Sequence, residues 1–113
     1  MYLRFYLLAG QAMDALHMDY AANSFDVVID KGTIDALSCS PQCWAVIRDA
    51  NKEVQRVLAP GGSYVVFSYA PPDVRFPHFQ RRCFTWEATA TTIRAQLILY
   101  TITAFLIPCQ HRS

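Results

Sequence analysis

The fold is decided between residues 25 and 70, where the apolar segments FDVVID (25–30) and SYVVFSYA (63–70) flank an amphipathic stretch. Both segments are apolar on both faces, which is typical of a parallel strand covered by helices on each side. Between them, apolar residues recur at spacings of three and four and predict a helix with one buried face. These residues are Ile47, Ala50, Val54, Val57 and Leu58. Pro60-Gly61-Gly62 is expected to end the helix and to turn the chain into the second strand. The whole predicts a right-handed βαβ unit of an α/β fold.

Further strands are predicted on either side of this unit. Residues 5–13 (FYLLAGQAM) form an apolar run that ends at Asp14, and two more strands are expected at 84–92 and 96–105. In the first of these two, Phe84 and Trp86 alternate with polar residues, so both aromatic rings are expected in the core.

The segment that follows the predicted strand 63–70 is basic and aromatic. Residues 73–82 are expected to form a loop or a short helix. We interpret its charges as a solvated basic loop, since no groove or helix pattern organises them; they are Arg75, His78, Arg81 and Arg82.

Composition excludes several classes of protein. The chain has 113 residues, 53% hydrophobic and 17% charged, with a formal net charge of +1. These values are typical of a folded domain and give no electrostatic reason to expect nucleic acid as a partner. The apolar run 97–107 is too short to span a membrane, and the run 5–9 is too short for a secretory signal. We therefore expect a cytoplasmic protein without a membrane partner.

The cysteines do not predict a metal site. Cys39 and Cys43 form one loose pair, and Cys83 and Cys109 are isolated. Structural zinc sites usually need two tight ligand pairs, so free thiols in a reducing compartment are the expected state.

Two stretches carry a family resemblance. MDALHMDYAANSFDVVIDKGTIDAL (13–37) and EVQRVLAPGGSYVVFSYAPPDVR (53–75) resemble the class I S-adenosylmethionine-dependent methyltransferases. Within that class they are similar to the methyltransferase-like proteins that include lysine methyltransferases of elongation factor 1-alpha. The resemblance covers about residues 10–93 and is most specific at the acid-Lys-Gly corner after residue 29.

The resemblance implies a set of cofactor-binding residues. Asp14 would accept a hydrogen bond from the adenine amine of S-adenosyl-L-methionine, with the backbone amide of Ala15 close to the ring. Asp30 and Lys31 would lie at the end of the central strand, where the methionine part of the cofactor meets the methyl acceptor. Ligands of open α/β sheets bind at such carboxyl ends of strands. Methyl transfer needs no covalent nucleophile, and we assign no catalytic residue.

The same residues also have purely structural interpretations. Asp14 could be a turn or cap residue, and Asp30 could cap a helix that begins near Thr33. Lys31 could be a solvated surface charge. For the phrase DKGTIDAL (30–37) as a whole, the functional interpretation is favoured because Gly and charged residues meet at the carboxyl end of a strand.

The length of the chain bears on the fold that the resemblance implies. Domains of this class have about seven strands, with a Gly-rich loop after the first strand and an acid after the second, both upstream of the position of Asp14. Only 13 residues precede Asp14, and they contain no GxG. We therefore predict that 1–113 is an N-terminally truncated, partial Rossmann-like methyltransferase sheet, made of the third to seventh strands and lacking the first two.

Two expectations follow from that partial sheet. Its first strand should pair directly with strand 25–30, or the chain should dimerise, because an unpaired apolar edge is an aggregation hazard. Binding of S-adenosyl-L-methionine by the chain should be absent or very weak.

The functional prediction is an S-adenosylmethionine-dependent protein-lysine N-methyltransferase with a protein substrate, such as a translation factor. The alternative is a non-catalytic remnant of that fold, which would act as a protein-interaction module through its edge strand and basic loop. The sequence determines neither the methyl acceptor nor the oligomeric state.

Overall fold

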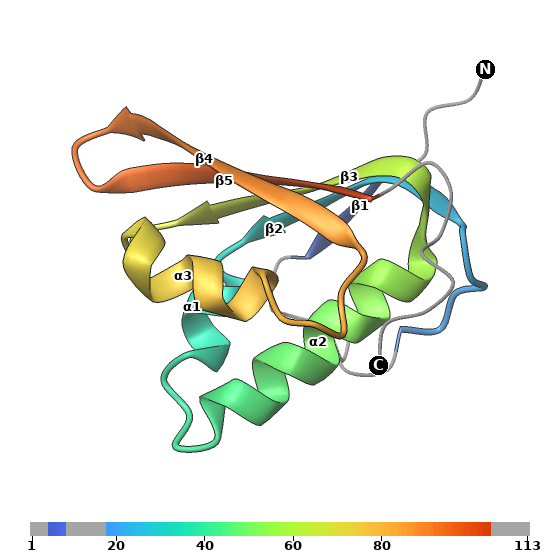
Figure 1. The fold of residues 1–113 in the computed structure, drawn as a ribbon, viewed down its shortest axis with the longest axis horizontal. Coiled ribbons are helices and arrows are strands. Elements are labelled where there is room, and N and C mark those ends of the chain that lie inside the picture. The colour runs from blue at the N-terminus through green and yellow to red at the C-terminus, as the bar shows by residue number, and fades with distance from the viewer. Residues whose placement is uncertain (1–4, 9–17, 105–113) are drawn as a thin grey trace.

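The computed structural model describes residues 5–8 and 18–104. The chain forms a mixed α/β structure with one sheet and helices packed against it (Figure 1). In chain order the elements are β1 (Phe5–Leu8), β2 (Phe25–Lys31), α1 (Thr33–Leu37), α2 (Cys43–Val57), β3 (Leu58–Ser68), α3 (Pro72–Phe79), β4 (Trp86–Arg94) and β5 (Leu97–Ala104).

The sheet has five strands in the order β1-β2-β3-β5-β4. Strands β1, β2 and β3 are parallel, and β5 runs antiparallel to both of its neighbours. The α/β class and the partial Rossmann-like sheet are thus confirmed. The first strand lies directly beside β2, with Phe5 opposite Val27, which is one of the two arrangements predicted for a partial sheet.

The helices cover one face of this sheet. Figure 1 shows α1, α2 and α3 on the same side, below the strands. Accordingly, Val28 and Asp30 of β2 are fully buried, whereas Ile29 between them is only half-buried. Within the described residues, the expectation that helices cover β2 on both faces is therefore wrong. An apolar run on both faces of a strand shows that each face avoids water but does not show what covers it.

The core lies between the sheet and the helices. The apolar side of α2 packs there through Ile47, Val54 and Val57, as its spacing predicted. The largest fully buried side chains are the rings of Tyr64 and Tyr100, which come from β3 and β5.

The junction of α2 and β3 differs from the prediction. The helix ends at Val57, and Pro60-Gly61-Gly62 lies inside β3 instead of forming the stop. The register with β2 jumps there, because Phe25 is opposite Leu58 while Val27 is opposite Ser63. The extra residues of β3 form an irregularity in the strand, which Gly61 accommodates with a φ of 79°. The prediction that residues 60–62 stop the helix and form the turn before the strand is therefore wrong, because strand pairing with β2 already begins at Leu58.

The C-terminal hairpin agrees with the prediction. Strands β4 and β5 pair antiparallel along their length, and Ala95 turns the chain between them with a φ of 48°. Phe84 and Trp86 are buried in the core, as expected. The Trp86 indole N–H donates a hydrogen bond of 2.7 Å to the carbonyl of Phe79, which ties the start of β4 to the end of α3.

Candidate functional site

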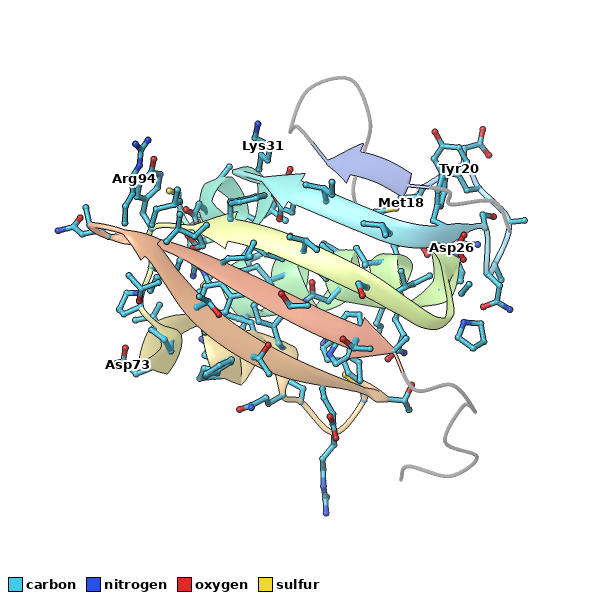
Figure 2. All side chains as sticks on the ribbon, turned by 90° about the horizontal axis from the view of Figure 1, so that it is seen from above. Met18, Tyr20, Asp26, Lys31, Asp73 and Arg94 are labelled. Carbon is cyan, nitrogen blue, oxygen red and sulfur yellow. The ribbon has the colours of Figure 1, made fainter. Side chains whose placement is uncertain are left out.

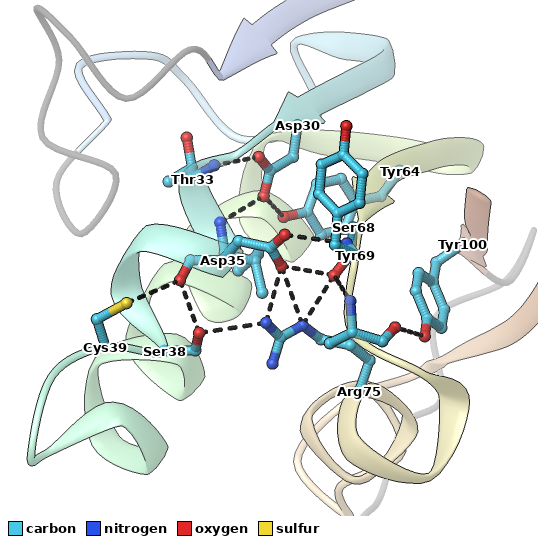
Figure 3. Close-up of polar contacts among 12 residues, drawn as sticks. Asp30, Thr33, Asp35, Ser38, Cys39, Tyr64, Ser68, Tyr69, Arg75 and Tyr100 are labelled. Atoms are coloured by element: carbon cyan, nitrogen blue, oxygen red, sulfur yellow. Dashed lines mark hydrogen bonds and ion pairs between the residues drawn. The ribbon is translucent and has the colours of Figure 1, made fainter. Parts of the chain in front are cut away.

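The corner after β2 is built around Asp30. Its Oδ1 accepts a hydrogen bond of 2.7 Å from the Thr33 amide, and its Oδ2 accepts one of 2.9 Å from the Ile34 amide (Figure 3). The Tyr64 hydroxyl donates to the same Oδ2 over 3.3 Å. Gly32, with a φ of 102°, provides the left-handed backbone that turns the strand into α1. These contacts are those of the helix-capping interpretation of Asp30.

Burial controls the ionisation of this carboxyl group. Asp30 has no exposed surface, and burial raises its pKa to about 6 although three hydrogen bonds favour the charged form. Burial also raises the pKa of the Tyr64 phenol well above its usual value, and the neighbouring Asp30 adds to that rise. The pair is therefore a shielded hydrogen-bonded unit beneath the surface.

A cavity of about 690 Å³ opens beside this corner. It lies at the carboxyl ends of β2 and β3 and at the start of β5, which is where open α/β sheets bind ligands. Its walls are mostly apolar, with Lys31, Gly32 and Asp35 on one side; the other lining residues are Ile29, Phe67, Tyr69 and Leu97.

Asp35 joins three elements at the rim of this cavity. Its Oδ1 accepts a 2.8 Å hydrogen bond from Nη2 of Arg75 and a 2.5 Å hydrogen bond from the Ser68 hydroxyl. Its Oδ2 accepts a 3.1 Å hydrogen bond from the Tyr69 amide. Burial works to raise the pKa of Asp35, but the hydrogen bonds from Ser68, Arg75 and Tyr69 outweigh it, and the pKa lies below its ordinary value. Asp35 thus fixes the connection between β3 and α3.

The predicted basic loop is not one solvated surface. Arg75 and His78 are buried, with 4% and 5% of their surface exposed, because α3 forms there and docks on the core. The His78 ring packs on Trp44 with centroids 4.1 Å apart, and Arg81 lies 5.9 Å from the Trp44 centroid. The interpretation as solvated charges is wrong for Arg75 and His78, since their partners come from α1, α2 and β3, far away in the sequence.

The predicted cofactor-binding residues fall into three groups. Lys31 is exposed and lines the cavity, and its contact with the cofactor stays a prediction. Asp30 is buried next to Lys31, is not among the residues that line the cavity, and has both carboxylate oxygens engaged, so its direct contact with the cofactor stays a prediction. Asp14 and Ala15 lie outside the described residues.

Three residues of the site were missed. Asp35 and Arg75 both lie within the quoted motifs, but only the fold brings them together at 2.8 Å. Tyr69 follows β3 and has 68% of its surface exposed at the cavity. Its position after a strand was the one available signal, because side chains that follow parallel strands gather at the ligand-binding edge.

Comparison with known proteins decides the family. The family described as "Methyltransferase domain" matches residues 6–105, nearly the whole chain. The chain belongs to this methyltransferase domain family. The resemblance on motifs 13–37 and 53–75 is thereby confirmed.

Curated relatives of this methyltransferase domain are named as lysine methyltransferases. EEF1A lysine methyltransferase 4 of Mus musculus is 34% identical over 93 residues, which covers 75% of this chain and 36% of that protein. The mitochondrial citrate synthase-lysine N-methyltransferase CSKMT of Homo sapiens is 30% identical over 95 residues, covering 74% of this chain and 38% of that protein. The methyltransferase domain therefore spans little more than a third of the length of these relatives.

Solved structures share its fold. A SAM-dependent methyltransferase of Methanosarcina mazei superposes with a TM-score of 0.58 at 10% identity, over 84% of this chain and 66% of that one. A proposed S-adenosyl-L-methionine-dependent methyltransferase of Methanococcus maripaludis gives a TM-score of 0.62 at 12% identity, over 88% of this chain and 55% of that one.

The part of the chain that the structure describes holds neither a cluster of metal ligands nor a membrane-spanning helix. No group of three or more potential metal ligands occurs among residues 5–8 and 18–104. No helix in these ranges has both the length and the apolar character needed to cross a membrane.

Proposed function

We propose that this methyltransferase domain takes part in S-adenosylmethionine-dependent transfer of a methyl group to a lysine side chain of a protein. The relatives quoted above carry names with different protein substrates, an elongation factor and citrate synthase, but the same acceptor residue. The observation that carries the proposal is the cavity at the carboxyl ends of β2 and β3, with Lys31 and Gly32 of the acid-Lys-Gly corner in its wall.

The cavity suits the proposed cofactor in size and chemistry. Its volume of about 690 Å³ lies within the range of roughly 300–1,000 Å³ typical of small-molecule sites. Ile29, Phe67 and Leu97 offer apolar surface to a purine, and the Lys31 ammonium is placed to pair with the carboxylate of an amino acid group. When bound, S-adenosyl-L-methionine would supply a methyl group on a positively charged sulfur. Asp14 and Ala15 remain the proposed partners of its adenine.

The residues of the chain would contribute alignment and exclusion of water. Transfer of a methyl group is an in-line displacement, so holding donor and acceptor in line accounts for much of the rate. The apolar wall excludes water from the reacting atoms. Tyr69 stands exposed at the cavity, and its amide is held by Asp35, so its ring is positioned to contact an acceptor side chain.

Substrate and location belong to the same proposal. A translation factor is the favoured protein substrate, since several relatives act on eEF1A by name. A cytoplasmic location is supported by the cysteines Cys39, Cys43 and Cys83, which are free thiols in the structure.

A chimeric enzyme tests the proposed function directly. In mouse EEF1A lysine methyltransferase 4, the segment that matches this chain is replaced with the corresponding residues of this chain. Transfer of labelled methyl from S-adenosyl-L-methionine to lysine in purified eEF1A and in citrate synthase is then measured. We expect the chimera to methylate one of the two proteins.

Two variants of the chimera sharpen the test. Lys31→Glu should lower methyl transfer by about tenfold, because the new glutamate carboxylate would repel the carboxylate of the cofactor that the lysine ammonium attracts. Lys52→Glu, an exposed change on α2 on the other side of the sheet, should leave transfer unchanged. A chimera that is folded by circular dichroism but transfers no label to either protein would refute the proposal.

A further inference from the structure

Strand β4 forms one edge of the sheet. It pairs with β5 on one side and has no neighbouring strand on the other side within the described residues. In Figure 2 it is the outermost strand, at the opposite edge from β1. The backbone N–H and C=O groups that point away from β5 therefore have no strand partner. Such a row of groups can accept the backbone of another extended segment.

The free edge of β4 lacks the features that most often block strand addition. Proteins commonly protect sheet edges with lysine, proline or bulges. From Trp86 to Thr92 the strand contains no lysine or proline, and its register with β5 is regular up to Thr92. The threonines of this stretch are β-branched and favour an extended backbone. The chemistry of the edge therefore permits pairing along most of the strand.

A cavity of about 420 Å³ runs along this edge. Successive residues of β4, from Trp86 to Thr89, line it. Trp86 and Ala88 point to the helix side of the sheet, whereas Glu87 and Thr89 point to the other side. Side chains on opposite faces border one cavity only where it follows the edge between them. We call this cavity the edge groove; its other lining residues, which precede β4, are Gln80, Arg81 and Phe84.

Opposite charges border the edge groove on its two sides. Nη1 of Arg81 donates a 3.4 Å hydrogen bond to the carbonyl of Trp44 in α2, which holds the guanidinium on the helix side. Glu87 is exposed and lies on the other side of the sheet. None of the salt bridges found among the described residues involves Arg81 or Glu87. Both charges are therefore open to a ligand of opposite charge.

These features point to a single extended protein segment as the occupant. The stretch from Trp86 to Thr89 spans about 10 Å, so about four residues of an added strand would lie in the groove. Neighbouring residues of a strand point to opposite faces, so the acidic residue beside Arg81 and the basic residue beside Glu87 must be adjacent in sequence. A second copy of this chain fits less well. A two-fold axis centred on the groove would bring arginine towards arginine and glutamate towards glutamate.

We propose that the edge groove binds an extended protein segment as an added strand on β4, and that adjacent acidic and basic residues of this segment pair with Arg81 and Glu87. Backbone hydrogen bonds along the free edge supply the affinity, and the two charges supply the specificity. The edge groove shares no lining residue with the cavity assigned to the cofactor, so the proposal does not depend on methyl transfer.

Synthetic peptides test the site on the full chain. The probe is a short acetylated and amidated peptide of threonine and valine, with glutamate and lysine at adjacent central positions. Binding is followed by the amide chemical shifts of the isotopically labelled chain. We expect saturable shifts centred on Ala88 and Thr89, with a dissociation constant on the order of 100 μM to 1 mM.

Two altered peptides separate strand addition from simple charge attraction. In the first, one residue is placed between glutamate and lysine, which sets both charges on one face. It should bind about threefold more weakly than the probe. In the second, the central amides are N-methylated, which removes the backbone donors. It should bind at least about tenfold more weakly. Both peptides act on the unaltered chain, so this comparison stands even where a variant fails to fold.

Charge reversals test the two side chains. Arg81→Glu and Glu87→Lys should each weaken binding of the probe by about threefold to tenfold, since each turns an attraction into a repulsion. The double variant exchanges the signs and should recover, because a shift of the peptide by one residue restores both pairs. Arg82→Glu is the matched control and should have little effect. Arg82 is an exposed neighbour of Arg81 that does not line the groove.

Several results would overturn the proposal. They are the absence of saturable shifts up to about 3 mM peptide, shifts away from β4, equal binding of the two charge arrangements, and undiminished binding of the N-methylated peptide. An Arg82→Glu effect equal to that of Arg81→Glu would indicate general charge attraction and would also overturn it. A dimer formed through β4, detected by sedimentation velocity, would make a second copy the occupant instead.

Discussion

At the scale of single residues, Asp30 holds the corner of the site together. Its carboxylate accepts from two amides and one phenol, and all three donors come from the segments that line or support the cavity. These hydrogen bonds stabilise the charged carboxylate but do not offset the free-energy cost of burying it, because no cation lies within hydrogen-bond distance of Asp30 among the described residues. The consequence is a pKa of about 6, against an ordinary 3.8.

This pKa predicts a pH dependence of stability. The folded pKa is raised, so the stabilising contribution of Asp30 is complete below about pH 4 and is lost as the pH rises through about 6. The loss amounts to about 3 kcal/mol. Asp30→Asn removes the titration, so the unfolding free energy of the unaltered chain relative to the variant should fall over this range. Urea unfolding at intervals from pH 4 to pH 7.5 measures it.

His78 is the main group that must be separated from this effect. Burial and the charges of Arg75 and Arg81 lower its pKa, so its contribution is lost as the pH falls below 6.5, the opposite sign. His78 is present in both the unaltered chain and the Asp30→Asn variant, so its contribution cancels in the difference between their unfolding free energies. A difference that is flat between pH 4 and pH 7 would contradict the assignment to Asp30.

Gly62 carries a second prediction at this scale. A Cβ there would lie 2.8 Å from the Ala59 carbonyl oxygen and 2.9 Å from the Asp26 carbonyl oxygen, both of them backbone atoms. Gly62→Ala should therefore lower the unfolding free energy by roughly 2–3 kcal/mol through overpacking. Gly32→Ala is the matched control, with no atom within 4 Å of its Cβ and only its positive φ to oppose it. It should cost about 1–2 kcal/mol. Thermal melts that rank Gly32→Ala as the more damaging change would contradict this account.

At the scale of elements, one ion pair docks α3 against α1 and β3. Arg75 of α3 reaches Asp35 of α1 at 2.8 Å and the Ser68 hydroxyl of β3 at 3.1 Å (Figure 3). The Tyr100 hydroxyl adds a 2.6 Å hydrogen bond to the Ala70 carbonyl just before α3. These contacts hold the segment that carries Tyr69 beside the cavity.

A double-mutant cycle measures this docking. Asp35→Ala leaves the buried Arg75 guanidinium without its carboxylate and should destabilise the chain by about 3 kcal/mol. Adding Arg75→Met should cost less than in the unaltered chain, with a coupling of about 1–2 kcal/mol. The exposed pair Arg48 and Asp49 is the control and should couple by less than about 1 kcal/mol. Additive effects of the Asp35 and Arg75 changes would show that the pair does not act as one unit.

At the scale of the whole molecule, the described polar groups around the cavity are few. Asp35 is engaged by Arg75, Ser68 and Tyr69, which leaves Lys31 and the Tyr69 phenol as the polar side-chain groups available to a ligand among the described lining residues. A cofactor with a ribose, a purine and an amino acid group needs more anchors than these two for tight binding.

Binding of S-adenosyl-L-methionine by this chain should accordingly be absent or very weak. Isothermal titration of the 113-residue chain with the cofactor should give no saturable heat below about 100 μM. Lys31→Glu should abolish any residual binding, and Lys52→Glu should not alter it. A micromolar dissociation constant for the unaltered chain would contradict the prediction.

The sequence alone determined the elements that depend on local patterns. Local patterns predicted the βαβ unit from β2 to β3, the β4–β5 hairpin and the core positions of Phe84 and Trp86. They could do so because residues spaced by three or four share one face of a helix, and residues spaced by two share one face of a strand. The family resemblance was carried by the same stretches. For Asp30, capping and cofactor binding were both left open, since a carboxylate after a strand suits either role.

The tertiary structure decided the features that depend on partners far away in the sequence. The residues around Arg75 in the sequence predict a solvated charge. Only the docking of α3 brings Arg75 within hydrogen-bond distance of Asp35, which lies 40 residues earlier in the chain. In the same way, β2 is apolar on both faces, but the placement of the described helices on one side left the other face open. Local patterns report that a side chain avoids water or carries charge; what covers or pairs with it is decided by long-range packing, which no short window of sequence contains.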